Sequence, residues 1–239
     1  MTAITNPPSQ IVYPSSDGEP VAETYDHLYV LLTTLEVLRQ YLKGQRATVL
    51  ANQFFYYAQG FPKLRVAPDV MVIFDVEPGG RDNYKLWEEG QVPRVIFEMT
   101  SRGTKDQDTG FKKGLYEQLE VQEYWLFDPK GEWLEGQLQG YQLQNGTYVP
   151  MAEHRSAALK LRLEIEGNLL AFYREDTGEK LLLPDELAET LKAETQRRIE
   201  AEQRAEQERQ RAEQERQRAE ELQTLLERYQ AQFGELTEE

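Results

Sequence analysis

The sequence predicts a mixed α/β (α+β) fold, in which helices flank a mixed central sheet and antiparallel hairpins and a long polar helix follow. Three almost continuously apolar runs, at 70–76, 94–99 and 123–128, are typical of strands covered on both faces. Apolar residues at helical spacing precede these runs and also separate the last two. A seven-residue repeat, AEQERQR, stands at 205–211 and again at 212–218, and it predicts a coiled-coil-like helix.

The first predicted helix lies in VAETYDHLYVLLTTLEVLRQYLKG, residues 21–44. Gly44 is well placed to end it. Its apolar residues recur at helical spacing and form a wide stripe: Tyr25, Leu28, Tyr29, Leu32, Leu35, Leu38 and Leu42. Before this helix, residues 1–20 contain four prolines together with Ser, Asn and Gly, and we expect a flexible N-terminal arm. After it, the runs ATVLAN and FFYYAQ indicate two strands.

The segment DQDTGFKKGLYEQLEV separates the second and third buried strands. Phe111, Leu115 and Leu119 stand at positions i, i+4 and i+8 within it, which predicts a helix with these three residues on its buried face. Beyond residue 130 the signals change to antiparallel strands. An Asn-Gly pair in YQLQNGTYV predicts one hairpin, and GNLLAFYREDTGEKLLL predicts a second with its turn near 176–179.

The C-terminal segment, 185–239, carries 16 acidic and 9 basic residues. Only alanine recurs on the seam of its heptads, and Glu208 and Glu215 occupy the partner seam position. This pattern allows a solvated spacer helix or self-association through an apolar stripe in the last turns, and four ion pairs at i, i+4 would support the helix. The stripe is Leu222, Leu226, Tyr229 and Phe233; the pairs are Arg204–Glu208, Arg209–Glu213, Arg211–Glu215 and Arg216–Glu220. The predicted parts are thus an arm at 1–20, a domain at 21–184 and a charged helical tail at 185–239.

The composition excludes several kinds of site. There are no cysteines, so disulfides, thiolate nucleophiles and cysteine-based zinc sites are excluded, and two histidines are too few for a histidine-rich metal site. A net charge of −15 argues against broad electrostatic attraction to nucleic acid, although it allows a local basic groove. The N-terminus has no apolar signal region and no stretch of 18 apolar residues occurs, so we expect a cytoplasmic protein with no membrane association.

Two carboxylates stand beside the buried strands. Asp69 follows Pro68 directly before the strand at 70–76, and Glu98 ends the strand at 94–99. Acidic side chains in such places are costly unless they are paired or bind a metal, and a divalent cation would relieve their mutual repulsion. Oxygen ligands without histidine or cysteine suit Mg²⁺. Each residue alone has a plainer interpretation, since Pro-Asp is a common turn element and a glutamate can simply end a strand.

The helix after Glu98 offers two lysines. With about 100° per residue, Lys112 lies roughly 60° from the centre of the predicted buried face, whereas Lys113 faces away. Lys112 can therefore reach toward the strand ends, and it forms an i, i+4, i+8 row with Asp108 and Tyr116. A simple surface ion pair between Asp108 and Lys112 is the alternative. We interpret His27 as a helix histidine and not as a metal ligand.

Several blocks resemble one known family. APDVMVIFDV, RDNYKLWEEGQVPRVIFEMTSRGT, DTGFKKGLYEQLEVQEYWLFDP and DTGEKLLLPDELAE are similar to the Uma-two-type putative restriction endonucleases, a group within the PD-(D/E)XK phosphodiesterase superfamily. The resemblance covers residues 20–190 and implies a restriction-endonuclease-like core with a Mg²⁺-dependent site. Pro68-Asp69 matches the family's PD and Glu98 its second acidic residue, while Ser101, Asp108, Lys112 and Tyr116 match further positions. The sequence departs from the superfamily pattern at Thr100, where a lysine would stand.

The resulting hypothesis is a Mg²⁺-dependent (or Mn²⁺-dependent) DNA endonuclease. Asp69, Glu98 and the main-chain carbonyl of Met99 would hold the metal, and Lys112 would assist the attacking water or the scissile phosphate. Ser101, Asp108 and Tyr116 would support the site. The alternative is a catalytically inactive nuclease fold that binds nucleic acid or a protein partner and assembles through its C-terminal helix. A homo-oligomer formed through that helix is compatible with either hypothesis.

Overall fold

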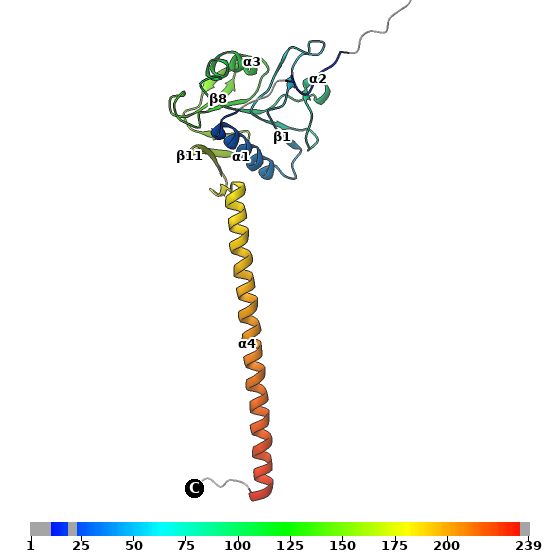
Figure 1. Cartoon of the computed structure of the whole chain (residues 1–239), viewed down its shortest axis with the longest axis vertical. Helices are drawn as coiled ribbons and strands as arrows, with labels where there is room; N and C mark the ends of the chain where they lie inside the picture. The colour runs from blue at the N-terminus through cyan, green and yellow to red at the C-terminus, as the bar shows by residue number, and fades with distance from the viewer. Residues whose placement is uncertain (1–10, 19–22, 235–239) are drawn as a thin grey trace, which may run out of the picture. The chain divides into compact units, whose positions relative to one another are not determined.

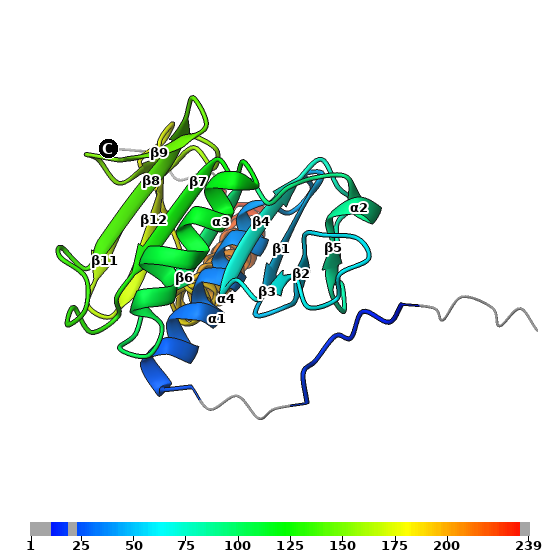
Figure 2. The same cartoon turned by 90° about the horizontal axis from the view of Figure 1, so that it is seen from above.

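A six-stranded mixed sheet forms the centre of the first part of the chain (Figures 1 and 2). The computed structural model describes residues 11–18 and 23–234, and the chain divides into two units, Met1–Pro184 and Asp185–Glu239. The strand order is β1-β4-β6-β7-β8-β9, with β6 and β7 parallel and the other neighbours antiparallel. The strands are β1 (Ala47–Ala51), β4 (Val70–Phe74), β6 (Val95–Met99), β7 (Glu123–Phe127), β8 (Leu138–Gln144) and β9 (Thr147–Pro150).

The central strands bury both faces, as their continuous apolar runs predicted. Because successive side chains alternate across a strand, Val70 and Phe97 enter one hydrophobic cluster while Met71 and Ile96 enter the other. The first cluster includes the apolar side of α1 (Tyr25–Tyr41) and residues of a second, four-stranded sheet. The second cluster includes Tyr116 of α3 (Lys113–Gln118), which Figure 2 shows lying across the strands. The sheet therefore has a layer of structure on each face.

The predicted helix at the start of the domain is α1, and its buried side differs in part from the predicted stripe. Val30, Val37 and Leu38 are buried, whereas Leu28 and Leu32 are exposed. Thr24 caps the helix, because its Oγ1 accepts a hydrogen bond from the His27 backbone N–H at 3.3 Å.

Shorter elements complete the domain. The four-stranded antiparallel sheet has the order β10-β11-β12-β13, and a three-stranded sheet has the order β3-β2-β5. Both predicted hairpins are present, β8–β9 around Asn145-Gly146 and β12–β13 around 175–179. The remaining elements are β2 (Phe55–Tyr56), β3 (Arg65–Val66), β5 (Tyr84–Lys85), α2 (Leu86–Glu89), η1 (Gln107–Lys112), β10 (Arg155–Ser156), β11 (Leu161–Glu166), β12 (Leu169–Arg174) and β13 (Lys180–Leu181).

Residues 11–18, the described part of the predicted N-terminal arm, pack against the domain. The Tyr13 ring packs against Tyr56 and Trp87 with centroid distances of 5.2 and 5.0 Å, and the Asn83 amide donates to the Tyr13 carbonyl at 3.1 Å. Burial of the aromatic ring thus fixes this part of the arm on the domain. Residues 1–10, 19 and 20 of the predicted arm lie outside the described residues.

In its described part, up to residue 234, the second unit forms one helix, α4 (Pro184–Phe233), which is about 75 Å long at 1.5 Å per residue. Between 188 and 232 every side chain is exposed. Of the four predicted ion pairs the structure shows Arg216–Glu220, at 3.1 Å, while Arg204 and Arg209 contact Glu200 and Glu206 instead. Across the described ranges, no helix combines the length and the apolar character needed to span a membrane.

Candidate active site

Asp69 and Glu98 meet because of the register of two neighbouring strands. Val70 of β4 pairs with Phe97 of β6 in antiparallel register, so the next positions outward are Asp69 and Glu98. The Asp69 backbone N–H donates to Glu98 Oε2 at 3.3 Å, and Asp69 Oδ2 accepts from the Met99 backbone N–H at 2.6 Å. The two carboxylates predicted from separate strand ends are therefore brought to one place.

Lys112 is the lysine that reaches this place. Its Nζ donates to Glu98 Oε2 at 2.9 Å and lies 3.0 Å from Asp108 Oδ1. The Lys112 side chain is 14% exposed, whereas the Glu98 side chain is fully buried. Lys113 points elsewhere, with its Nζ 3.7 Å from the centre of the Tyr141 ring. One ammonium group thus bridges two buried carboxylates.

The local helix geometry differs from the α-helix assumed in the prediction. Residues Gln107–Lys112 form a π-helix, η1, and α-helical geometry begins only at Lys113. The wider turn shifts side chains around the axis, and Phe111, predicted to be buried, is 62% exposed. The most buried side of this segment is instead the polar row Asp108, Lys112 and Tyr116. Such π-turns occur frequently at functional sites.

Tyr116 and Tyr124 complete the hydrogen bonding beneath the carboxylates. The Tyr116 hydroxyl donates to Glu98 Oε1 at 2.8 Å, and the Tyr124 hydroxyl donates to the Asp108 carbonyl at 2.9 Å. The two rings pack edge to face with centroids 5.2 Å apart. Glu98 therefore accepts three hydrogen bonds, from Asp69, Lys112 and Tyr116, and its position is fixed on all sides.

Burial dominates the electrostatics of the site. It raises the pKa of Glu98 to about 8, and the charges of Asp69 and Asp108 act in the same direction, while Lys112 opposes them. Burial lowers the pKa of Lys112, but the carboxylates of Glu98 and Asp108 outweigh it, so the net pKa is raised and the ammonium stays charged. Burial likewise raises the pKa of the Tyr116 hydroxyl, which remains a donor.

His27 lies in contact with the site, although its place in the sequence predicted only a helix histidine. Its Nε2 lies 3.5 Å from Asp69 Oδ1 and 3.6 Å from Glu23 Oε2, and it has no hydrogen-bond partner. Burial lowers the pKa of His27, but contacts with Asp69 outweigh that effect and raise it overall. The i, i+4 spacing of Glu23 and His27 at the start of α1 was the available signal. The contact between His27 and Asp69 joins residues 42 positions apart, and no pattern in the sequence indicates it.

Ser101 has a local structural contact. Its backbone N–H donates to Thr104 Oγ1 at 3.0 Å, and its own Oγ lies 3.3 Å from the same atom. Its carbonyl accepts from the Lys105 backbone N–H at 2.9 Å. Ser101 therefore shapes the turn between β6 and η1. It influences the carboxylates through the backbone of this turn and not through a hydrogen bond of its own side chain to them.

The donor set matches what Mg²⁺ uses in proteins. The ion takes one or two carboxylates and fills its other positions with water and phosphate oxygens. Asp69 and Glu98 supply two carboxylates. Glu98 Oε1 and Asp69 Oδ2 each accept one hydrogen bond and keep a second lone pair, whereas Glu98 Oε2 already accepts two, from the Asp69 backbone N–H and from Lys112. Within residues 11–18 and 23–234, no group of three or more acidic or histidine side chains could hold a metal ion. An ion at this place would therefore depend on main-chain, water or phosphate oxygens as well.

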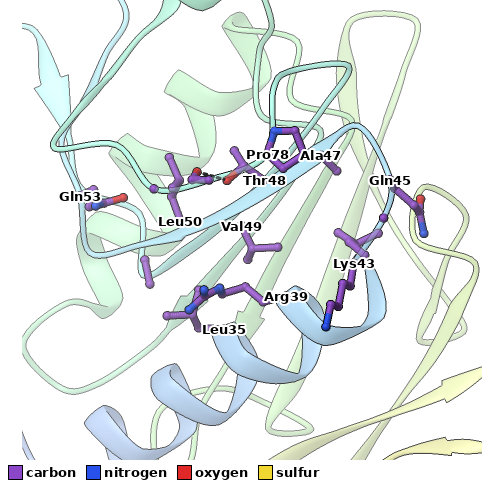
Figure 3. A pocket seen from close by; sticks show the side chains of 15 residues that line it. Leu35, Arg39, Lys43, Gln45, Ala47, Thr48, Val49, Leu50, Gln53 and Pro78 are labelled. Atoms are coloured by element: carbon purple, nitrogen blue, oxygen red, sulfur yellow. Dashed lines mark hydrogen bonds between the residues drawn. The ribbon is translucent and has the colours of Figure 1, made fainter.

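A different cavity, of about 390 Å³, lies between the end of α1 and β1 (Figure 3). Arg39 of α1 and Lys43, two residues after the helix ends, line it, and the β1 residues 47–50 along it are buried. It contains no acidic side chain and none of the residues that meet around Glu98. Its lining lacks the carboxylates that metal-dependent hydrolysis requires.

The comparisons with known proteins give a family match and a structural likeness. The model of the Uma2 family, described as a putative restriction endonuclease, matches residues 3–172. A solved structure of a putative nuclease from Anabaena variabilis is similar at 14% sequence identity and a TM-score of 0.42, with 59% of this chain and 77% of that chain covered. No curated protein matches. The family match includes β4, β6, η1 and α3, which carry the acidic and basic residues of the site.

Proposed function

Because the chain belongs to the Uma2 family of putative restriction endonucleases, we propose that it is a Mg²⁺-dependent or Mn²⁺-dependent endonuclease that hydrolyses phosphodiester bonds of DNA. The observation that carries this proposal is the convergence of Asp69, Glu98 and Lys112 at the ends of two adjacent strands. Two oxygen-ligand carboxylates beside one buried cation are the parts that metal-assisted phosphodiester cleavage requires.

Each residue has a role that its contacts support. Asp69 and Glu98 would hold the ion, with the Met99 carbonyl as a further ligand, and the bound ion would polarise the phosphate and lower the pKa of a water. Lys112, charged and already 2.9 Å from Glu98, would stabilise negative charge that develops on the phosphate oxygens. Asp108 and Tyr116 would position Lys112 and Glu98 through the contacts at 3.0 and 2.8 Å.

Plasmid cleavage tests the proposal. Wild-type protein with Mg²⁺ or Mn²⁺ should nick or linearise the plasmid, and Asp69→Asn, Glu98→Gln and Lys112→Met should each lower the rate by at least about 100-fold. The matched control is Lys113→Met, next in the chain but directed at Tyr141, which should retain the wild-type rate. Equal residual activity in all five proteins would identify a contaminating nuclease and refute the proposal.

A non-catalytic role is the second candidate, and one observation favours it. Asp69, Glu98, Asp108 and Lys112 already contact one another through hydrogen bonds and ion pairs made by the protein alone. Such a cluster could serve only to fix the strand ends in a nuclease fold that binds nucleic acid or a protein. Calorimetric titration with Mg²⁺ and Mn²⁺ separates the two candidates. Binding that is lost in Asp69→Asn supports the enzyme, and no binding in the wild type supports the scaffold.

We also propose that α4 is a spacer whose last turns self-associate. Leu222, Leu225, Leu226 and Tyr229 are exposed apolar side chains near its end, whereas Glu208 and Glu215 would be buried by pairing further upstream. Sedimentation of the full chain should therefore show an oligomer that becomes a monomer in the double variant Leu222→Glu, Leu226→Glu. The control, Ala205→Glu with Ala212→Glu, should sediment like the wild type.

A further inference from the structure

A cavity of about 260 Å³ is linked to the carboxylates through His27, which lines it and contacts Asp69. Three segments line it: the start of α1, the residues that follow β6, and the residues that follow β7. His27 belongs to the lining and also lies 3.5 Å from Asp69 Oδ1. Thr100 belongs to it as well, directly after the end of β6 and two residues after Glu98. A nucleotide with its phosphate at Glu98 would have this cavity beside it.

Two buried polar atoms of the lining make no hydrogen bond to any described residue. Thr100 is 1% exposed, and its Oγ1 is one of them. His27 Nε2 is the other, and its carboxylate neighbours Asp69 and Glu23 lie beyond hydrogen-bond geometry, at 3.5 and 3.6 Å. Buried polar atoms are almost always paired, because leaving one unpaired is costly. A ligand with its own donors and acceptors would satisfy both groups.

The outer part offers a flat stacking surface. The Arg102 guanidinium lies 6.0 Å from the centre of the Trp133 ring, and both residues line the cavity. The loop that carries Trp133 is fixed by Asp128, whose carboxylate accepts hydrogen bonds from four backbone N–H groups, those of Lys130, Gly131, Trp133 and Leu134. An indole and a guanidinium held in this way are the groups on which nucleobases stack in proteins that bind single strands.

The charge of the lining disfavours a free anion. Three carboxylates, Asp26, Asp128 and Glu132, face two permanently charged cations, Arg102 and Lys130, with His27 as the remaining titratable group, and the Lys130 ammonium lies 4.0 Å from the Asp26 carboxylate. A phosphate would therefore meet more negative than positive charge. A neutral planar group with hydrogen-bonding edges fits the same lining better.

We infer that this cavity binds a nucleobase of the strand being cut, next to the scissile phosphate. The inference rests on the proposed nuclease function and deepens it. A base can enter such a cavity only when it leaves the duplex stack, so the substrate is single-stranded DNA or an unpaired nucleotide within a duplex.

Binding without cleavage tests the inference separately from catalysis. The probe is a fluorescein-labelled oligothymidylate 12-mer, its anisotropy measured in EDTA with the full chain carrying Asp69→Asn. Adding Trp133→Ala or Arg102→Ala should weaken binding roughly tenfold, as expected for the loss of one stacked base. Trp133→Phe keeps an aromatic face and should stay within about twofold. The control Trp87→Ala, at a ring that packs on Tyr13, should bind like its parent.

Three outcomes of these measurements separate the nucleobase cavity from the nuclease activity. Equal binding by the parent and both the Trp133→Ala and Arg102→Ala variants would overturn the inference, as would tighter binding of a duplex of the same sequence than of the single strand. Arg102 is exposed, so its variant tests the cavity even if Trp133→Ala fails to fold. Weakened binding in these variants combined with an absence of plasmid cleavage by the wild type would refute the nuclease activity and leave the nucleobase cavity standing.

Discussion

Among single residues, Glu98 is the one whose chemistry the fold changes most. Its pKa is raised to about 8 because the carboxyl is buried. A carboxyl with a higher pKa in the folded chain than in the unfolded chain stabilises the fold fully below about pH 4.5 and loses that contribution as the pH rises through 8. Coordination of Mg²⁺ by Glu98, as proposed, requires the ionised form, so metal binding in this pH range would release a proton.

Mg²⁺ affinity should therefore increase as the pH rises from about 6 to 8. Calorimetric titrations in two buffers of different ionisation enthalpy would show proton release near pH 7. Glu98→Gln cannot ionise and should lose both the tight binding and its pH dependence. The same affinity at pH 6 and pH 8 would show that Glu98 is already ionised in the metal-free protein.

Tyr116 allows a test that changes one hydrogen bond and little shape. Tyr116→Phe removes the donor to Glu98 Oε1 and leaves a buried carboxylate with one partner fewer, which should lower the free energy of unfolding by about 1.5–3 kcal/mol. Chemical denaturation measures this change. Tyr141→Phe is the control, because its hydroxyl bonds the less buried Gln139 amide oxygen and its loss should cost under about 1 kcal/mol. An unchanged midpoint for Tyr116→Phe would mean that the Glu98–Tyr116 bond contributes nothing to stability.

Among the structural elements, the strands were predictable and the turn that carries Lys112 was not. The apolar runs of β4, β6 and β7 are local signals, and they place Asp69 and Glu98 at neighbouring strand ends. The choice between an α-turn and a π-turn at 107–112 depends on long-range contacts, since Lys112 must bridge Glu98 and Asp108. For the same reason, the prediction that Phe111 is buried was wrong, although Lys112 does point toward the strand ends as predicted.

Two glycines give a matched test of the elements around the site. Gly114 in α3 has no atom within 4 Å of a built Cβ and no positive φ, so Gly114→Ala should stabilise the protein by about 0.5–1 kcal/mol. In Gly140→Ala on β8, the added methyl group would collide with the Trp125 ring and the Met151 side chain, which should destabilise it by about 1–3 kcal/mol. Thermal or urea unfolding of the two variants measures both effects. Destabilisation by Gly114→Ala would contradict the open surroundings of that helix position.

For the whole molecule, charge limits how DNA can be held. The net charge of −15 is shared between the tail and residues 1–184, so no broad basic surface can dominate binding. In the proposed function, phosphate contacts must depend on a few local cations, such as Lys105 in the segment after β6, whereas Arg102 is assigned to base stacking. Single-strand affinity should then fall only slowly with salt, with a slope of log K against log salt of about −1 to −2, because each neutralised phosphate contributes about −0.7.

Anisotropy titrations between about 50 and 200 mM salt measure this slope. Lys105→Ala should make it shallower by about 0.7, whereas Lys113→Ala should leave it unchanged because that ammonium lies on the Tyr141 ring. A slope of about −5 or steeper would require many more phosphate contacts than these cations provide. In that case, the binding surface would have to extend well beyond the segment after β6, and the acidic composition would no longer indicate how this protein meets DNA.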